Sequence, residues 1–243
     1  MTADLAPTER GAIIRDGVAV GIATGAYGIS FGAISVSSGL DVWQTCALSL
    51  LVFTGASQFA LIGVVGAGGA PVSGAVTALL LGTRNTLYGL RLAPLLDWRG
   101  WRRLAGAHLV IDESTAMSVN RETTPAARVG FLSTGLSVFA LWNLATLAGA
   151  VAGTSLGDPR TYGLDAAVGA AFLALLWPRL ADRRNQFVGL VGAALALGLV
   201  PVAAAGVPVL AAGGVALLVG VVSRRSDPTE YPSHDDLPGG GHR

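Results

Sequence analysis

Charged side chains are the scarcest feature of this sequence. They make up 13% of its 243 residues, and between Gly17 and Thr83 the only one is Asp41. A typical soluble domain is about 25% charged and spreads its charges over its outer surface. The stretch therefore excludes a water-soluble domain. At about 20 residues per crossing it is long enough for three passes through a bilayer, so the sequence predicts a membrane protein.

Other absences exclude further classes of protein. A single cysteine, Cys46, excludes an internal disulfide and a cysteine metal cluster. Of the three histidines, His234 and His242 lie near the C-terminus and only His108 lies in the apolar part of the chain, so no histidine metal site is indicated. The net charge of +1 offers no basic surface for nucleic acid. We expect neither a metal nor an organic cofactor.

Apolar segments occupy most of the chain. They cover about residues 17–38, 43–65, 71–93, 104–119, 128–152, 163–180, 186–203 and 207–222. We therefore predict an all-α fold, a polytopic integral membrane helical bundle of about seven to eight hydrophobic segments. The segment 104–119 is short and contains two acids. It either crosses the bilayer or enters and returns, buried by its neighbours.

Three regions follow from this pattern. Residues 1–16 are polar and mix acids with bases, which predicts a cytoplasmic N-terminal segment and no signal peptide. Residues 17–225 form the predicted transmembrane domain. Residues 226–243 are rich in Asp, Pro, Ser and Gly, a composition typical of a disordered tail.

The arginines near the segment ends bear on orientation, because cytoplasmic loops are enriched in basic residues. Arg10 and Arg15 precede the first segment, and Arg121 and Arg128 precede the fifth. If the chain crosses eight times with both ends in the cytoplasm, these four arginines lie on the cytoplasmic side. The same scheme places the arginine-rich region 91–103 outside. Either the rule fails in this region or one of the preceding segments does not cross.

Two segments open with the same three residues. Gly39-Leu40-Asp41 begins the second segment and Gly163-Leu164-Asp165 begins the sixth. Transporters are often built from internal repeats with the substrate site at their interface. The match indicates an internal repeat, although three residues in a chain rich in Gly and Leu also agree by chance.

The second segment contains Thr54-Gly55-Ala56-Ser57-Gln58. Gln58 brings an amide into hydrocarbon, and Gly55 loosens the helix just before it. One interpretation is an interrupted helix whose freed backbone groups and Gln58 face a substrate cavity. The other is a hydrogen bond between helices, worth about 0.6 kcal/mol.

Arg84 is the first basic residue after Arg15 and lies inside the third segment. A guanidinium at such a depth costs roughly 2.5–3.5 kcal/mol or more unless it is partnered. It could bind a carboxylate through two hydrogen bonds, or it could extend to the interface, since Pro94 is close. Tyr88 lies one helical turn away on the same face, and Asn85 is turned by about 100°.

The fourth segment contains two adjacent acids, Asp112 and Glu113. His108, Asp112 and Thr115 follow helical spacing and would form one polar stripe along a continuous helix. Acids in an apolar segment suit an anchor for an ammonium group or a relay for protons. Alternatively, the segment lies at the interface with both acids in water.

These motifs together resemble the AzlC family, the large subunit of bacterial branched-chain amino acid exporters of the AzlCD type, from about Gly17 to Val222. The residues that carry the resemblance are Phe53-Thr54-Gly55-Ala56-Ser57-Gln58-Phe59, Arg84 with Leu87-Tyr88-Gly89, Asp112-Glu113 with Ala116, Trp142 to Gly149, and Gly163-Leu164-Asp165. The resemblance implies a multi-pass permease of the bacterial inner (plasma) membrane that exports leucine, isoleucine, valine and similar amino acids. It also implies a small AzlD-like membrane protein as the partner.

The chain departs from the family pattern at two positions. Where the family shows Asn-x-Arg-His, this sequence has Gly82-Thr83-Arg84-Asn85. Asn85 replaces an imidazole that could carry a proton, and Gly82 replaces an amide that could contact the substrate. The departures bear on substrate identity and on the coupling ion.

An aliphatic amino acid is a zwitterion with an apolar side chain, which sets what its site must offer. We assign its carboxylate to Arg84 and its ammonium to Asp112 or Glu113, which are expected to pair with Arg84 when no substrate is bound. Orientation of the substrate is assigned to Gln58, Asn85 and Tyr88.

Two other functions remain open from sequence. The first is a membrane assembly subunit that does not transport. The second is an intramembrane enzyme, in which Ser57 and His108 would act as nucleophile and base. No nucleophile elbow or oxyanion motif surrounds Ser57, so the sequence favours a protein that is not an enzyme.

Overall fold

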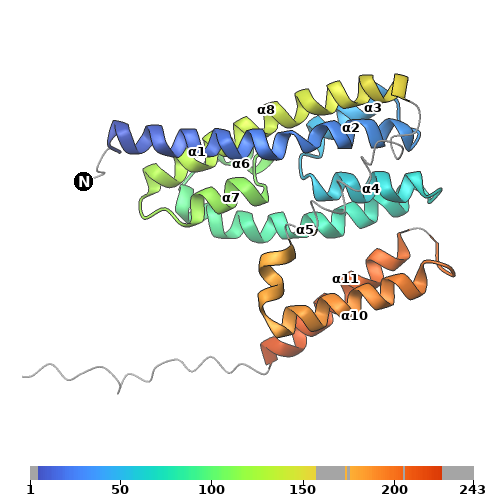
Figure 1. The fold of residues 1–243 in the computed structure, drawn as a ribbon. Coiled ribbons are helices and arrows are strands. Elements are labelled where there is room, and N and C mark those ends of the chain that lie inside the picture. The colour runs from blue at the N-terminus through green and yellow to red at the C-terminus, as the bar shows by residue number, and fades with distance from the viewer. Residues whose placement is uncertain (1–4, 157–172, 174–175, 205, 226–243) are drawn as a thin grey trace, which may run out of the picture.

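The computed structural model describes residues 5–156, 173, 176–204 and 206–225, and these residues form helices without strands (Figure 1). The helices are α1 (Pro7–Gly25), α2 (Tyr27–Ser37), α3 (Val42–Leu51), α4 (Ala56–Gly66), α5 (Pro71–Leu96), α6 (Gly100–His108), α7 (Asp112–Val119), α8 (Thr124–Leu156), the short 3-10 helix η2 (Trp177–Ala181), α10 (Arg183–Leu199) and α11 (Val207–Arg225). The all-α class is confirmed for this part of the chain.

The lone acid of the long uncharged stretch begins a helix. The Asp41 carboxylate accepts a hydrogen bond from the Gln44 backbone N–H at 2.7 Å, and the Gln44 side chain accepts one from the Asp41 N–H at 2.9 Å. Such reciprocal bonds satisfy two of the backbone donors that a helix start leaves open. The charge of Asp41 is therefore explained by local structure.

A row of glycines packs α1 and α2 against α8. Gly17 lies against Ser133 and Thr134, and farther along the same face Gly32 lies against the backbone of Thr146 and Ala150. A Cβ on Gly28, between them, would lie 2.6 Å from the Trp142 carbonyl oxygen. Small residues permit such close approach of helices in membranes. The contacts move toward higher residue numbers along α8 as they do along α1 and α2, so α1–α2 and α8 run in the same direction.

Helices α3 and α4 form a hairpin that enters and leaves the bundle at the same end. Thr45 donates to the Ser35 hydroxyl at 2.9 Å, while Ser49, farther along α3, reaches Thr146, which packs against Gly32. Helix α3 therefore runs opposite to α2. Helix α4 runs along α2 in the same direction. Its Phe59 ring meets Phe31 at 5.5 Å, and its last residue, Gly66, adjoins Ser38.

This hairpin differs from the predicted continuous second segment at 43–65. The apolar run is present, but the chain reverses between Leu51 and Ala56. Gly55 adopts φ +59°, a left-handed conformation that favours glycine. The interrupted helix that Gly55 suggested is confirmed, and the interruption is a full reversal.

Helices α6 and α7 form a second hairpin, which enters from the opposite end. Leu109, in the reversal before α7, adjoins Gly135, and Met117 of α7 adjoins Gly130, so α7 runs opposite to α8. Arg128, near the start of α8, donates to the Leu96 carbonyl at the end of α5 at 2.8 Å. The chain thus enters and leaves this hairpin at one end of the bundle. Of the two alternatives for 104–119, the structure shows the one that enters and returns.

The two hairpins give the chain an inverted internal repeat. A long helix followed by a hairpin occurs at 7–66 and again at 71–119, with the second unit running in the opposite direction. Inverted repeats are characteristic of secondary transporters. The repeat therefore involves other residues than the Gly-Leu-Asp match suggested. The second copy of that match, Gly163–Asp165, lies outside the described residues.

The first hairpin also removes the contradiction in the arginine pattern. Because α3–α4 returns to its starting end, α5 brings the region 91–103 back to the end where α1 begins (Figure 1). Arg10, Arg15, Arg121 and Arg128 lie at this same end, which we call the arginine-rich end. The predicted alternative that one segment before 91–103 does not cross fits this arrangement.

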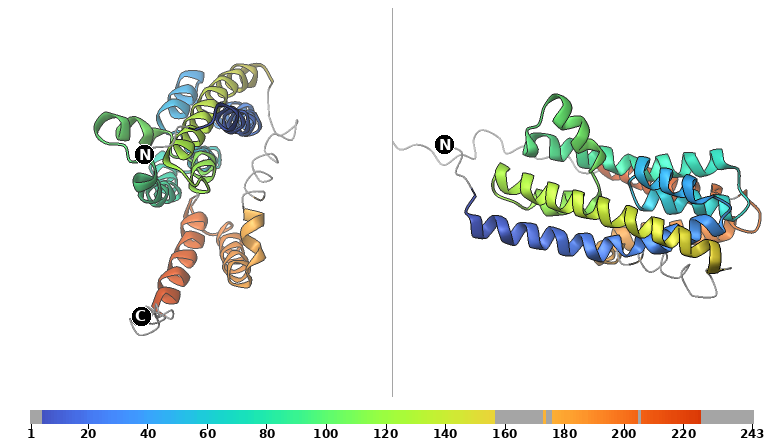
Figure 2. Two further views of the ribbon diagram at one scale, coloured as in Figure 1. Left: turned by 90° about the vertical axis from the view of Figure 1, so that its left-hand side faces the viewer. Right: turned by 90° about the horizontal axis from the view of Figure 1, so that it is seen from above.

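By length and composition, two stretches within the described residues could cross a bilayer, Pro7–Ser37 and Thr124–Ser155. The helices of the first hairpin are shorter because the reversal divides their apolar segment, so the count of seven to eight segments stays a prediction. Helices α10 and α11 pack on each other, with Gly192 against Ala212, and lie beside α5 (Figure 2). The predicted segment 163–180 falls largely outside the described residues, and the predicted tail 226–243 does so entirely.

Candidate functional site

The reversals of the two hairpins meet halfway along α8. Phe53 lies in the reversal of the first hairpin and His108 directly before that of the second, and their ring centroids are 6.2 Å apart. Both rings also contact Phe139 of α8, at 5.1 Å for Phe53 and 5.5 Å for His108. The starts of α4 and α7 are thereby brought to the middle of the bundle. The N-terminal end of a helix favours negative charge, so both helix starts direct a positive potential to this region.

Gln58 stabilises the first reversal. Its side-chain oxygen accepts from the Gly55 N–H at 3.1 Å, and its side-chain nitrogen donates to the Leu48 carbonyl of α3 at 3.2 Å. The side chain is fully buried. Its amide therefore satisfies the Gly55 N–H at the reversal and adds a second bond to the Leu48 carbonyl, which also accepts from the Val52 N–H. These bonds direct the side chain to the backbone of the first hairpin.

Ser114 binds backbone groups of the second reversal, as Gln58 does in the first. Like Gln58, it is the third residue of the helix that follows the reversal. Its hydroxyl accepts from the Ile111 N–H at 3.1 Å and donates to the Leu109 carbonyl at 2.6 Å. The two halves of the repeat thus solve the same hydrogen-bonding problem at the same position. Sequence reasoning missed Ser114 because a serine in a helix carries no distinct signal.

We predict that Gln58→Ala destabilises the protein by about 1–3 kcal/mol. The change leaves the Gly55 N–H without its partner, at about 1–3 kcal/mol for one such group, whereas the Leu48 carbonyl still accepts from the Val52 N–H at 2.9 Å. Thermal unfolding of the purified protein in detergent measures the loss. Gln44→Ala is the matched control, because Gln44 makes a similar capping bond at an exposed site and its loss is expected to cost about 1 kcal/mol or less. Equal unfolding temperatures for the two variants would contradict this role of Gln58.

A polar cluster of Arg84, Tyr88 and Asp112 lies beside the start of α7. The Arg84 guanidinium contacts one Asp112 oxygen at 2.8 Å, and the Tyr88 hydroxyl donates to the other at 2.6 Å. Side-chain exposure is 31% for Arg84 and 21% for Asp112, so the pair is mostly covered. The expected pairing of Arg84 with an acid is present, and the predicted shared face of Arg84 and Tyr88 is what lets both reach Asp112.

Unused hydrogen-bonding groups lie close to this cluster. Within the described residues, the buried Nε of Arg84, the Oδ1 of Asn85 and the Oγ of Ser57 have no hydrogen-bond partner. Ser57 faces α5, because its Oγ lies 3.6 Å from the position that a Cβ on Gly82 would occupy. Buried polar groups without partners are rare and costly. Here they provide donors and acceptors for a small polar ligand.

The other predicted site residues lie around this cluster rather than in it. Glu113 is adjacent to Asp112 but is turned toward Thr24 of α1. Gln58 lies in the first turn of α4, directly after the first reversal, and Asn85 lines a cavity that does not include the ion pair. The predicted stripe of His108, Asp112 and Thr115 is wrong, because one helix ends at His108 and the next begins at Asp112.

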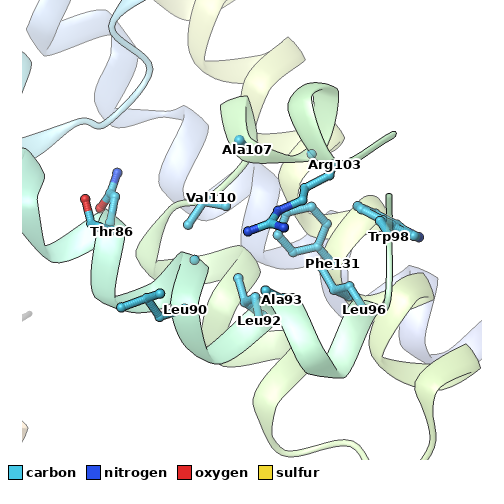
Figure 3. A pocket seen from close by; sticks show the side chains of 13 residues that line it. Thr86, Leu90, Leu92, Ala93, Leu96, Trp98, Arg103, Ala107, Val110 and Phe131 are labelled. Atoms are coloured by element: carbon cyan, nitrogen blue, oxygen red, sulfur yellow. The ribbon is translucent and has the colours of Figure 1, made fainter. Parts of the chain in front are cut away.

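The cavity that Asn85 lines lies between α5, α6 and α8 and has a volume of about 410 Å³ (Figure 3). Its walls are mainly apolar and include Leu92, Val110 and Phe131, and Arg103 of α6 also lines it. The arginines of 91–103 served above only as a sign of orientation, since nothing in the sequence shows which of them lines a cavity.

The residues proposed for an enzyme do not form a catalytic pair. Within the part of the chain that the structure describes, Ser57 Oγ has no hydrogen-bond partner, and the His108 ring packs against Phe53 and Phe139. No group of histidine, cysteine and acidic residues that could hold a metal occurs among these residues.

Comparison with known proteins agrees with this arrangement. The model of the AzlC protein family matches residues 19–156, which contain both hairpins and the polar cluster. The chain belongs to the AzlC family. Its similarity extends to an uncharacterized membrane protein of Helicobacter pylori strain 26695, 26% identical over 177 residues that cover 71% of this chain and 77% of the relative. A further relative is an uncharacterized membrane protein of Archaeoglobus fulgidus, 31% identical over 69% of this chain and 74% of the relative.

No solved structure matches the chain significantly. The AzlC family is associated with transport rather than catalysis, and the relatives are named as membrane proteins. This chain is accordingly a membrane protein of the AzlC type.

Proposed function

We propose that this AzlC-family protein is the permease subunit of an exporter of branched-chain or similar aliphatic amino acids. It crosses the bacterial inner membrane several times and operates by alternating access, coupled to an ion or to protons. A small AzlD-like membrane protein completes the transporter. The observation that carries the proposal is the Arg84–Asp112 ion pair, held where two oppositely directed hairpins meet.

The ion pair has the chemistry that a zwitterion requires. Arg84 offers a guanidinium to a carboxylate, and Asp112 offers a carboxylate to an ammonium group. An amino acid can therefore insert between the two side chains, exchanging one ion pair for two. The unpartnered Nε of Arg84 adds a further donor beside them.

Insertion of the substrate would also link binding to conformational change. Asp112 is the first residue of α7, and Arg84 belongs to α5, so their ion pair joins the two helices. Separating the pair releases the second hairpin from α5. Since inverted repeats allow equivalent movements at the two ends of a bundle, each hairpin can open one side in turn. Glu113, next to Asp112 and mostly covered, is our candidate for the proton carrier.

The proposal is tested by efflux of radiolabelled leucine from bacterial cells that lack their own leucine exporters. Cells that express this chain together with an AzlD-like partner should lose leucine faster than control cells and faster than cells with either protein alone. A panel of amino acids at two pH values then defines the substrate and tests proton coupling. No accelerated efflux of any amino acid in the presence of the partner would refute the proposal.

A further inference from the structure

The cavity between α5, α6 and α8 leads from the middle of the bundle to its arginine-rich end. Asn85 and Leu96 both line it, and about 16 Å of α5 separates them at 1.5 Å per residue. Asn85 follows Arg84 in the chain, and Leu96 is the last residue of α5. The volume of about 410 Å³ lies within the range of about 300–1,000 Å³ that small-molecule sites occupy.

Arg103 supplies the charge of this cavity. Figure 3 shows its side chain turned inward from α6, toward Val110 and Phe131. Within the described ranges its guanidinium makes no salt bridge or hydrogen bond, whereas Arg84 and Arg128 bind partners there. Arg103 is an exposed residue that lines the open cavity. Its guanidinium is therefore accessible to a carboxylate, and such a counter-ion lowers the cost of a charge beside hydrocarbon. The structure therefore offers an anion a charged partner above an apolar floor.

Aromatic side chains line the outer part of the cavity. The Trp98 ring meets Phe131 edge to face at 5.5 Å and lies directly over Gly106, where a Cβ would come within 2.7 Å of the ring. Glycine at this position lets the indole approach α6. The aliphatic Leu92 and Val110 complete the wall next to Arg103. The lining thus suits a branched hydrocarbon group attached to an anion.

At the inner end the lining becomes polar. The buried Oδ1 of Asn85 has no hydrogen-bond partner within the described residues and is an acceptor. An ammonium group that reached this point would find a partner there, one residue from Arg84. A lipid acyl chain extending inward would end in a methyl group and leave this acceptor unsatisfied, so the lining favours a short molecule with a second polar group.

We propose that this cavity is the loading site of the transporter, in which Arg103 binds the carboxylate of an aliphatic amino acid before the substrate reaches Arg84 and Asp112. The apolar side chain of the substrate lies between Leu92, Val110 and Phe131. The identity of the substrate rests on the proposed function. The role of Arg103 and the preference for an aliphatic carboxylate rest on the cavity itself.

Titration calorimetry of the purified full-length protein in detergent tests the site. The probes are leucine, isocaproate, which is leucine without its ammonium group, and isoamylamine, which lacks the carboxylate. We expect leucine and isocaproate to bind and isoamylamine to bind far more weakly. Arg103→Gln should weaken isocaproate binding by about 10- to 100-fold, the range for loss of a charge-assisted hydrogen bond.

Arg99→Gln is the matched control, because Arg99 lies directly before α6 and does not line the cavity. It should bind isocaproate like the unmodified protein. Equal affinities of Arg103→Gln and Arg99→Gln, or isoamylamine binding as tightly as isocaproate, would overturn the proposal.

A second pair of variants tests the cavity by filling it. Ala107 lines the cavity, whereas Ala105 of the same helix lies on the other side of Trp98 and does not. Ala107→Phe should abolish isocaproate binding and Ala105→Phe should preserve it. Native mass spectrometry identifies the alternative occupant. A tightly held lipid that Ala107→Phe removes and isocaproate does not displace would overturn the proposal.

The two proposals fail in different ways. If the cells export leucine and Arg103→Gln leaves both isocaproate affinity and efflux unchanged, the loading site is wrong and the transport function stands. If no amino acid is exported while isocaproate binds through Arg103, the transport function is wrong and the carboxylate site stands.

Discussion

Arg84→Ala is expected to abolish leucine efflux while the protein still inserts into the membrane. The guanidinium is the group we assign to the substrate carboxylate, and it also neutralises Asp112 at 2.8 Å. Loss of a double charge-assisted interaction of this kind corresponds to a reduction of about 100-fold or more. The measurement is the initial rate of leucine efflux, normalised to the amount of protein in the membrane.

A double variant distinguishes the contribution of the Arg84–Asp112 ion pair to stability from its role in transport. In Arg84→Gln the Asp112 carboxylate loses its counter-ion, which destabilises a covered pair more than removing both charges does. Arg84→Gln combined with Asp112→Asn should therefore recover thermal stability in detergent but not efflux. Arg91→Ala is the control, because Arg91 is an exposed arginine of the same helix. Normal efflux in Arg84→Ala would remove Arg84 from the site.

Gly32→Leu is expected to prevent the protein from folding. A Cβ at this position would meet the Thr146 carbonyl oxygen and would lie 2.6 Å from the Ala150 backbone nitrogen. These are backbone atoms of α8, so the side chain fits only if α2 and α8 move apart. Their separation would expose the buried Phe31 and Trp142 contact, whose ring centroids are 6.0 Å apart. Overpacking of a close-packed core costs typically about 1–3 kcal/mol and more where backbone must shift.

The amount of monodisperse protein on size-exclusion chromatography in detergent measures this effect. Gly32→Ala should give folded protein with a lower unfolding temperature, which provides a graded comparison. Gly63→Leu is the control, since Gly63 lies within α4 and has open space where its side chain would be. A stable, monodisperse Gly32→Leu protein would show that close contact between α2 and α8 is not required.

The polar cluster shows what helical spacing can predict. Arg84 and Tyr88 are four residues apart in an uninterrupted helix, so their common face follows from the helix repeat alone. An arginine deep in an apolar segment needs a counter-charge, and the acids at 112–113 were candidates because they too lie in an apolar segment. The partner was therefore predictable. The choice of Asp112 over Glu113 was not, because it depends on the direction in which α7 leaves the second reversal.

Gln58 and Arg103 show where prediction from sequence ends. Gln58 was recognised as unusual, but the use of its amide depends on Leu48 of α3 coming alongside it after the chain reverses. Arg103 was one of several similar arginines, and only the fold places it in one cavity with residues of α5 and with Phe131 of α8. In both cases the partner atoms belong to helices whose relative position is set by contacts that no local pattern encodes.

The sequence by itself determined that this is a helical membrane protein and that Arg84 requires an acidic partner. These follow from hydropathy and charge, which act locally. Only the tertiary structure decided that two apolar segments turn back halfway and approach each other from opposite ends. The physical reason is that a few residues around Gly55, and a few after His108, suffice to reverse the chain. Whether a reversal is stable depends on Phe139 and its neighbours in α8, far away along the sequence.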